Sequence, residues 1–216
     1  MDLSVEGKSE RLLPGSHICQ LYNKVGEFVG VTARLIEVGL STDEKCFFAG
    51  AASSVKEMQD ALTKAGVNLA AAQASGQLVF LAEREPLLIG KRFDPYHLLS
   101  THQTFIAQAR RENWKACRIA IDMTWLTADD VATSEQVIKY EAAADAIFTF
   151  QNAPIISLIA YDYSKLPGVL VVEMLKLHPI AVVGKFIKRN PYYVNSEQYL
   201  LKILRVNREK GRVVAV

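Results

Sequence analysis

The feature that most constrains the fold is an alternation of short apolar runs with longer segments of helical periodicity. Bounded by turn residues or charges, such runs are typical of buried strands. They occupy residues 17–22, 45–49, 77–82, 117–121, 155–161 and 180–183. Because parallel strands need long crossovers, which are usually helices, this order favours a parallel sheet over a hairpin-built one. The sequence therefore predicts a single three-layer α/β domain, with a mostly parallel sheet and helices on both faces.

Helix boundaries can be predicted from the segments between these runs. Apolar residues at helical spacing over 28–38 predict a helix that ends near Gly39. Ser54, followed three positions later by Glu57, forms a capping-box pattern and predicts that the next helix begins there. Longer helices are expected from Pro95 to about residue 110 and over 134–146.

Composition limits the class of protein. Half of the 216 residues are hydrophobic and 22% are charged, which argues against a disordered or coiled-coil chain. With a formal charge of only +2, direct nucleic-acid binding is not expected. The sequence lacks a secretion signal and an apolar run of about 18 residues, so we expect a cytoplasmic protein without a membrane anchor. We divide it into a polar leader (1–14), one domain (15–200) and a basic C-terminal tail (201–216).

Cysteine and histidine spacing does not predict a metal site. Cys19, Cys46 and Cys117 form no CxxC pair and are expected to be buried, reduced thiols. His97 and His102 lie five positions apart on a predicted helix, whereas two ligands on one helix face need a spacing of three or four. We therefore expect neither a metal nor another cofactor.

The first candidate binding segment is the turn after the strand that ends at Tyr22. In open α/β sheets, ligands bind outside the carboxyl ends of the strands. Asn23 and Lys24 follow Tyr22 and lead into a helix whose free N–H groups favour an anion. A phosphate loop would need GxxxxGK[ST], and this turn lacks its Gly-Lys-Ser/Thr end. The triplet at residues 7–9 has no strand before it, and we interpret it as coincidence.

The other candidate binding residues lie at the ends of two further predicted strands. Asp122 comes directly after an apolar run, where a nucleotide hydrolase holds its magnesium, but a carboxylate there also commonly caps the next loop. Trp125 fits either a ligand wall or the edge of the core. Tyr161 and Asp162 close a further strand and fit either a pocket lining or a solvated strand end.

A series of short motifs in a fixed order resembles the MEDS domain family, the methanogen/methylotroph, DcmR sensory domain. The resemblance covers roughly residues 15–200. Its motifs are HICQLY at 17–22, Gly39-Leu40, Gly76-Gln77-Leu78, Phe93-Asp94-Pro95, Arg118, Asp122-Met123-Thr124-Trp125, Tyr140-Glu141, Tyr161-Asp162, His178-Pro179 and Asn190-Pro191-Tyr192-Tyr193. The family usually has glutamate where this chain has Asp122, and often cysteine where it has Ala160.

The resemblance implies a fold similar to the RecA/KaiC-like ATPases without a working phosphate loop. It also implies a sensory module that recognises small organic molecules, including hydrocarbon derivatives, and signals to transcription regulators or kinases. The regulator that names the family carries an N-terminal helix-turn-helix, for which the residues before the first strand leave no room. We therefore expect output through a regulatory protein partner.

Our first hypothesis is thus a non-enzymatic sensor of a small organic ligand that acts in trans. Its site is expected at Tyr22, Asn23, Lys24, Asp122, Trp125, Tyr161 and Asp162. The alternative is a degenerate RecA-like nucleotide-binding protein or weak NTPase, in which Lys24 would replace the missing lysine. A third reading is an interaction module that docks through its basic tail. A homodimer is compatible with each of these.

Overall fold

The computed structural model describes residues 12–128, 130–150, 154–183, 186–196, 198–199 and 201. The strands are β1 (His17–Tyr22), β2 (Lys45–Ala49), β3 (Leu78–Leu81), β4 (Cys117–Asp122), β5 (Ile155–Asp162), β6 (Ile180–Val183) and β7 (Phe186–Arg189). The helices are α1 (Val25–Ser41), α2 (Ala52–Lys64), α3 (Leu69–Ala74), the 3-10 turn η1 (Glu85–Leu87), α4 (Pro95–Arg111), α5 (Met123–Thr127), α6 (Ser134–Phe150) and α7 (Gly168–Leu177).

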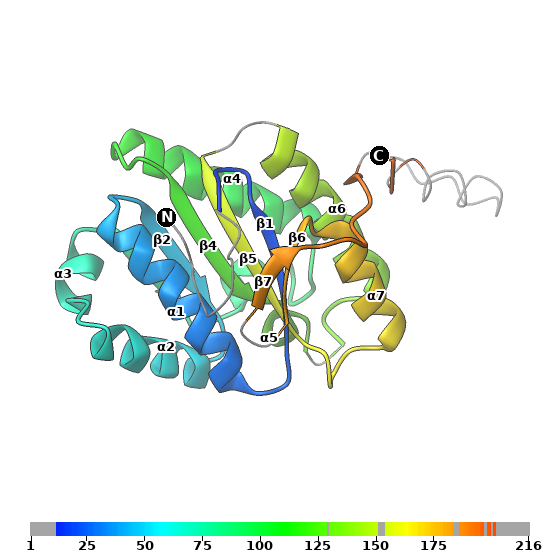
Figure 1. Ribbon diagram of the computed structural model, residues 1–216, viewed down its shortest axis with the longest axis horizontal. Coiled ribbons are helices and arrows are strands. Elements are labelled where there is room, and N and C mark those ends of the chain that lie inside the picture. The colour runs from blue at the N-terminus through cyan, green and yellow to red at the C-terminus, as the bar shows by residue number, and fades with distance from the viewer. Residues whose placement is uncertain are drawn as a thin grey trace.

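Seven strands form one sheet in the order β3-β2-β4-β5-β1-β6-β7. Every neighbouring pair is parallel except β6 and β7, which are antiparallel. Helices α1 and α2 cover one face, and α4, α6 and α7 cover the other (Figure 1). The predicted three-layer α/β domain with a mostly parallel sheet is confirmed.

Two hydrophobic cores lie on the two faces of the sheet. Phe28 of α1 and Met58 of α2 are fully buried in one, and Tyr140 of α6 and Met174 of α7 in the other. All residues of β1, β4 and β5 are buried, as expected for central strands of a parallel sheet. Because side chains alternate along a strand, neighbouring residues at one strand end face different cores.

The structure corrects several local predictions. Helix α2 begins at Ala52 with Ala51 as its N-cap, so the capping box at Ser54 is wrong. The N–H of Val55 already donates to the carbonyl of Ala51, and the Ser54 side chain is buried within the first turn instead of capping it. Helix α6 continues to Phe150, beyond the expected end. Strand β7 and helix α3 were not predicted, because both are short and lack a clear period.

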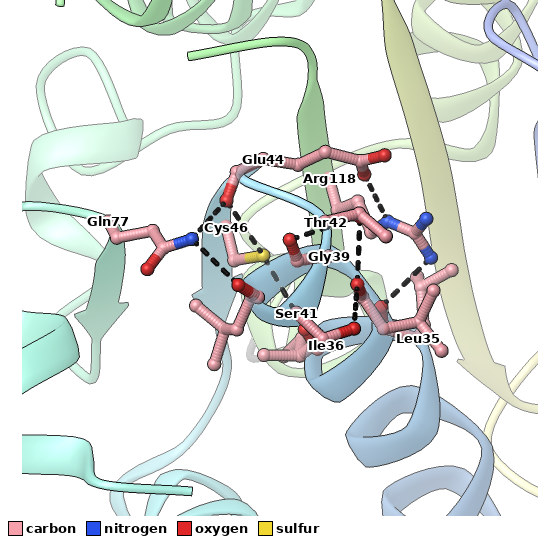
Figure 2. A network of polar contacts seen from close by, with 11 residues as sticks. Leu35, Ile36, Gly39, Ser41, Thr42, Glu44, Cys46, Gln77 and Arg118 are labelled. Carbon is pink, nitrogen blue, oxygen red and sulfur yellow. Dashed lines mark hydrogen bonds and ion pairs between the residues drawn. The ribbon is translucent and has the colours of Figure 1, made fainter.

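A buried polar network joins the C-terminal end of α1 to the sheet (Figure 2). Arg118 of β4 forms an ion pair with Glu44 through Nε and donates from Nη1 to the carbonyl of Leu35, 3.0 Å away. The Nε2 of Gln77 donates to the carbonyls of Leu40 and Glu44, at 3.0 and 3.2 Å. Leu40, Gln77 and Arg118 belong to the motifs that carry the family resemblance. They have a structural role here, because they anchor the C-terminal end of α1 over β2 and β4.

Three further expectations concern the cysteines, the chain ends and membrane insertion. All three cysteines are buried and free, as predicted. The leader up to residue 11 and the basic tail from residue 202 lie outside the described residues. Within the part that the structure describes, no helix is long and apolar enough to cross a membrane.

Candidate functional site

Three polar residues of the predicted site meet at the carboxyl ends of adjacent strands. The pairing register places Tyr22 of β1 opposite Asp162 of β5, and Asp122 of β4 opposite Ala160 of β5. The Tyr22 hydroxyl hydrogen-bonds to Asp122, and all three side chains are largely buried. Tyr22 also stacks on Phe28 of α1, with 5.1 Å between ring centroids. We call Tyr22, Asp122, Thr124 and Asp162 the strand-end cluster.

Asp122 holds the start of α5 in place. Its Oδ1 accepts from the backbone N–H groups of Thr124 and Trp125, at 3.1 and 3.3 Å. The hydroxyl oxygen of Thr124 accepts from the N–H of Asp162 at 2.7 Å, which connects α5 to β5. Asp122 therefore caps a short helix. This agrees with the alternative stated from the sequence, in which the carboxylate caps the segment after its strand.

The strand-end cluster combines an acid whose pKa is raised with a neutral phenol. Burial raises the pKa of Asp122, although hydrogen bonds from Tyr22 and the two N–H groups oppose this change. Burial and the Asp122 charge raise the pKa of Tyr22 far above its ordinary value. Asp162 differs: burial would raise its pKa, but Ser164 and Lys165 outweigh this effect and lower it. The cluster thus offers donors and acceptors to a polar ligand.

Asn23 and Lys24 are exposed in the connection between β1 and α1. They are the only residues between Tyr22, where β1 ends, and Val25, where α1 begins. The Lys24 side chain makes no capping hydrogen bond there. A connection of this length has no room for a loop that wraps a phosphate, because that loop needs several residues between its strand and helix.

Tyr161 and Trp125 do not join the strand-end cluster. Tyr161 faces the opposite core, where its hydroxyl hydrogen-bonds to Glu141 of α6. Trp125 is half-buried and packs against that same core. The predicted site residues are therefore divided between the two faces of the sheet, because alternation along β5 separates Tyr161 from Asp162.

A second polar cluster, not predicted from the sequence, lies in the core beneath α6 and α7. His17 at the start of β1, Glu141 of α6 and His178 after α7 have fully buried side chains. The Nε2 atoms of His17 and His178 each lie 3.3 Å from Oε2 of Glu141. We call these three residues the buried histidine cluster.

Further polar groups surround the buried histidine cluster. His17 Nδ1 lies 3.5 Å from Asp145 Oδ1, and the other carboxylate oxygen of Asp145 accepts from the Tyr193 hydroxyl at 2.8 Å. His178 Nδ1 lies 2.7 Å from the carbonyl oxygen of Met174. The carbonyl of Met174 thus fixes His178 Nδ1, whereas His17 Nδ1 makes only an ion-pair contact with Asp145, and both Nε2 atoms face Glu141.

The charges in the cluster depend on one another. Burial alone would lower the pKa of His17, but Asp145 and Glu141 outweigh it and raise the pKa to about 9. Burial would raise the pKa of Glu141, whereas His178 and His17 lower it to about 2. Burial and the charge of His17 lower the pKa of His178. His17 therefore holds a proton more readily than His178 does. The Glu141 carboxylate between the two rings is charged.

Strand order explains why sequence reasoning missed this cluster. His17 and His178 come together because β1 and β6 are neighbours in the sheet, although the two residues lie far apart in the chain. His178 precedes Pro179, and a proline at this place in a sequence indicates a turn before it indicates a binding site. Adjacent helical residues such as Tyr140 and Glu141 point in different directions, which gives no sign from the sequence that both are fully buried. The only available signal was their occurrence among the recurring motifs.

The comparison with known families now bears on the whole domain. The model of the methanogen/methylotroph, DcmR sensory domain matches residues 16–179, more than half of the chain. The chain belongs to the MEDS family. This MEDS domain is therefore a member of a sensory domain family, and its matched region runs from the start of β1 to the end of α7. No protein of curated function matches the chain.

Proposed function

We propose that this MEDS domain binds a small organic ligand at the strand-end cluster and passes that state to a regulatory protein partner. The observation that carries the proposal is the meeting of Tyr22, Asp122 and Asp162 at the carboxyl ends of three adjacent parallel strands. Ligands in open α/β sheets bind outside this edge. Membership of a sensory family supports a role in recognition.

The chemistry of the edge favours a small ligand with one polar group. Asp122 accepts or donates a hydrogen bond according to its protonation, and the Tyr22 hydroxyl lies beside it. Val25 and Tyr163, which immediately follow this edge on α1 and β5, expose apolar surface to solvent. Lys24 and Lys165 are also exposed there, so a negatively charged group on the ligand would be favoured.

The alternative, nucleotide binding at the same edge, has weaker support. Asp122 occupies the strand-end position of a magnesium-holding acid, but its Oδ1 is already engaged by two N–H groups. The connection after β1 consists of Asn23 and Lys24 alone. A nucleotide would therefore lack the backbone cradle that normally holds its phosphates. The resemblance to RecA-like ATPases stays a prediction.

The test uses Trp125 as a built-in reporter, because its backbone N–H bonds directly to Asp122. The chain has two tryptophans, and Trp114 lies before β4, at the opposite edge of the sheet. A Trp114→Phe variant makes Trp125 the sole indole. Its fluorescence and the protein's melting temperature are followed during titration with small organic acids, alcohols and halocarbons, and separately with magnesium and ATP. Selective binding to the native state raises its melting temperature.

A matched pair of variants locates the site. Asp122→Asn in the Trp114→Phe background should lose the ligand response, whereas Asp60→Asn on the exposed face of α2 should keep it. Equal affinity in both variants would remove the strand-end cluster as the site. A response to magnesium and ATP alone would instead favour the nucleotide alternative. Absence of a response to every compound in the wild-type protein would count against ligand binding at this edge.

A further inference from the structure

The buried histidine cluster has the spacing of a metal site. Both Nε2 atoms lie 3.3 Å from the same carboxylate oxygen, Oε2 of Glu141. Ligand atoms ~2.0–2.1 Å from a tetrahedrally bound zinc ion stand about 3.4 Å apart. One ligand atom from each of the three residues lies within 4.8 Å of the other two. An ion would therefore need only a small adjustment of these side chains.

The ligand atoms are buried, and no hydrogen bond among the described groups satisfies them. His17 Nε2, His178 Nε2 and Glu141 Oε2 all belong to fully buried side chains, and their ion-pair contacts at 3.3 Å do not have the geometry of hydrogen bonds. Buried polar atoms are usually satisfied, because leaving one unpaired costs about 1–3 kcal/mol. Here three such atoms converge on one point, which is how unoccupied metal ligands are arranged.

The groups behind these atoms are those that orient metal ligands. A metal-binding histidine commonly donates its other ring N–H to a carboxylate or a backbone carbonyl. His17 Nδ1 faces Asp145, and His178 Nδ1 faces the carbonyl of Met174. The hydroxyl of Tyr161 hydrogen-bonds to the remaining oxygen of Glu141. Hydrogen bonds thus hold one edge of Glu141 and of His178, the Asp145 carboxylate faces one edge of His17, and the opposite edges of all three side chains face one another.

We propose that His17, Glu141 and His178 bind a divalent transition-metal ion of the zinc class. Two imidazoles and a carboxylate suit such an ion, and this set leaves a fourth coordination position open. Binding would release the proton of His17 to solvent, and the carboxylates of Glu141 and Asp145 would then balance the two charges of the ion, with both histidines neutral. The site is separate from the strand-end cluster, which lies on the other face of the sheet. The inference goes beyond ligand binding there and does not depend on it.

Metal binding would add a shared ion to three elements that are already joined by the ion pairs of His17 and His178 with Glu141. The ligands come from the start of β1, the middle of α6 and the end of α7. The two imidazole rings now lie against each other, with 4.1 Å between their centroids. An ion shared by both Nε2 atoms turns the rings apart, so its occupancy is expected to stabilise the packing of β1 and α7 around α6.

The test measures metal content and thermal stability of the whole chain. Protein treated with a chelator is dialysed against micromolar Zn²⁺, and bound zinc is measured by elemental analysis. We expect about one ion per chain and a higher melting temperature for the wild type, because the site forms only in the folded state. Glu141→Gln and His178→Gln should lose most of the bound zinc. His102→Gln is the matched control, because His102 is also buried on this side but is not in the cluster.

A second measurement keeps the proposal testable if the ligand variants do not fold. X-ray absorption of the zinc-loaded wild-type protein should show imidazole nitrogen and carboxylate oxygen ligands at about 2.0–2.1 Å. The proposal is overturned if the wild type retains no zinc, or if zinc lacks the imidazole signature. Equal zinc content in His102→Gln and in both ligand variants would also overturn it, because the ion would then be bound elsewhere on the chain.

Discussion

Gly39 of α1 lies directly against the side chain of Arg118 on β4. A Cβ at position 39 would stand 2.7 Å from Arg118 Cδ and 2.7 Å from Cys46 Sγ. Real Cβ atoms do not approach other atoms this closely, and Arg118 cannot withdraw without breaking its ion pair with Glu44 (Figure 2). The close contact between helix and sheet therefore depends on glycine at this position.

Gly39→Ala should consequently destabilise the domain. Overpacking of this kind costs about 1–3 kcal/mol, and the loss should exceed the gain in helix propensity. Gly30→Ala is the matched control in the same helix, because a Cβ at that exposed position would meet nothing within 4 Å. That variant should be neutral or more stable by about 0.5–1 kcal/mol. Chemical denaturation measures both, and equal stability of the two variants would contradict the packing argument.

Glu112 compensates a buried ammonium group at the amino-terminal end of β2. Lys45 of β2 has only 1% of its side chain exposed, forms an ion pair with Glu112 and lies 5.7 Å from the centroid of the Phe105 ring. The hydrogen bonds from Lys45 and Gln108 lower the pKa of Glu112 to about 2, from an ordinary 4.5. Glu112→Gln should therefore lower the melting temperature, because the lysine charge loses its anion.

The pH dependence of this pair has a definite sign. A carboxyl group whose pKa is lowered by folding stabilises the native state above its unfolded pKa and loses that contribution as the pH falls. The stability difference between wild type and Glu112→Gln should be largest above about pH 4.5 and shrink toward pH 2. Thermal melts across this range measure it, with Glu135→Gln on the exposed side of α6 as control. A difference that does not change with pH would rule out the ion pair as its cause.

The order of strands and helices was predictable because it depends on local periodicity. Each central strand is a short apolar run bounded by turn residues or charged residues, and the runs at β1, β2 and β5 match the observed strands closely. The antiparallel β7 was not predictable in the same way, since its short, charged run acquires its meaning only by pairing with β6. Sequence periodicity records how a segment is buried, but not which distant segment lies beside it.

The site was predictable only in part, for the same reason. Tyr22, Asp122 and Asp162 were expected to lie together because strand ends in parallel sheets share one edge, and the structure places them together there. Tyr161 was assigned to the wrong neighbourhood, because its side chain faces the Glu141 side of the sheet. His17 and His178 are adjacent only through the pairing of β1 with β6, which requires the strand order. The spacing of residues along the sequence does not indicate which distant strands pair with each other.

Thr124 provides a test of the strand-end cluster that does not need a ligand. Its hydroxyl oxygen accepts the N–H of Asp162, and the Thr124 side chain is buried. Thr124→Val keeps the shape but leaves that N–H without its acceptor, which should cost about 1–3 kcal/mol. Thr63→Val on the exposed surface of α2 should cost much less. Equal costs in denaturant titrations would show that the hydroxyl of Thr124 does not stabilise the end of β5.

The side-chain amide of Asn190 joins the segment after β7 to the end of α7 through its nitrogen, and its oxygen holds the turn that follows. Its Nδ2 group donates to the carbonyls of Leu175 and His178, and its Oδ1 accepts from the N–H of Tyr192 at 3.0 Å. Asn190→Asp would place a carboxylate oxygen against two carbonyl oxygens in a largely buried position. An uncompensated buried charge of this kind should cost about 3–5 kcal/mol at neutral pH.

Lowering the pH should partly restore the Asn190→Asp variant. Burial beside two carbonyls raises the pKa of the new carboxyl group, and a protonated oxygen can again donate to one of them. An acid with a raised folded pKa binds more protons when folded, so the stability of the variant relative to wild type should increase as the pH falls below that pKa. Melts at pH 8 and pH 5 test this, with Asn68→Asp at the exposed N-cap of α3 as control. Aspartate caps a helix as well as asparagine does, so the control should stay near wild type. If Asn190→Asp is equally destabilised at both pH values, its amide does not act as a buried donor to the α7 end.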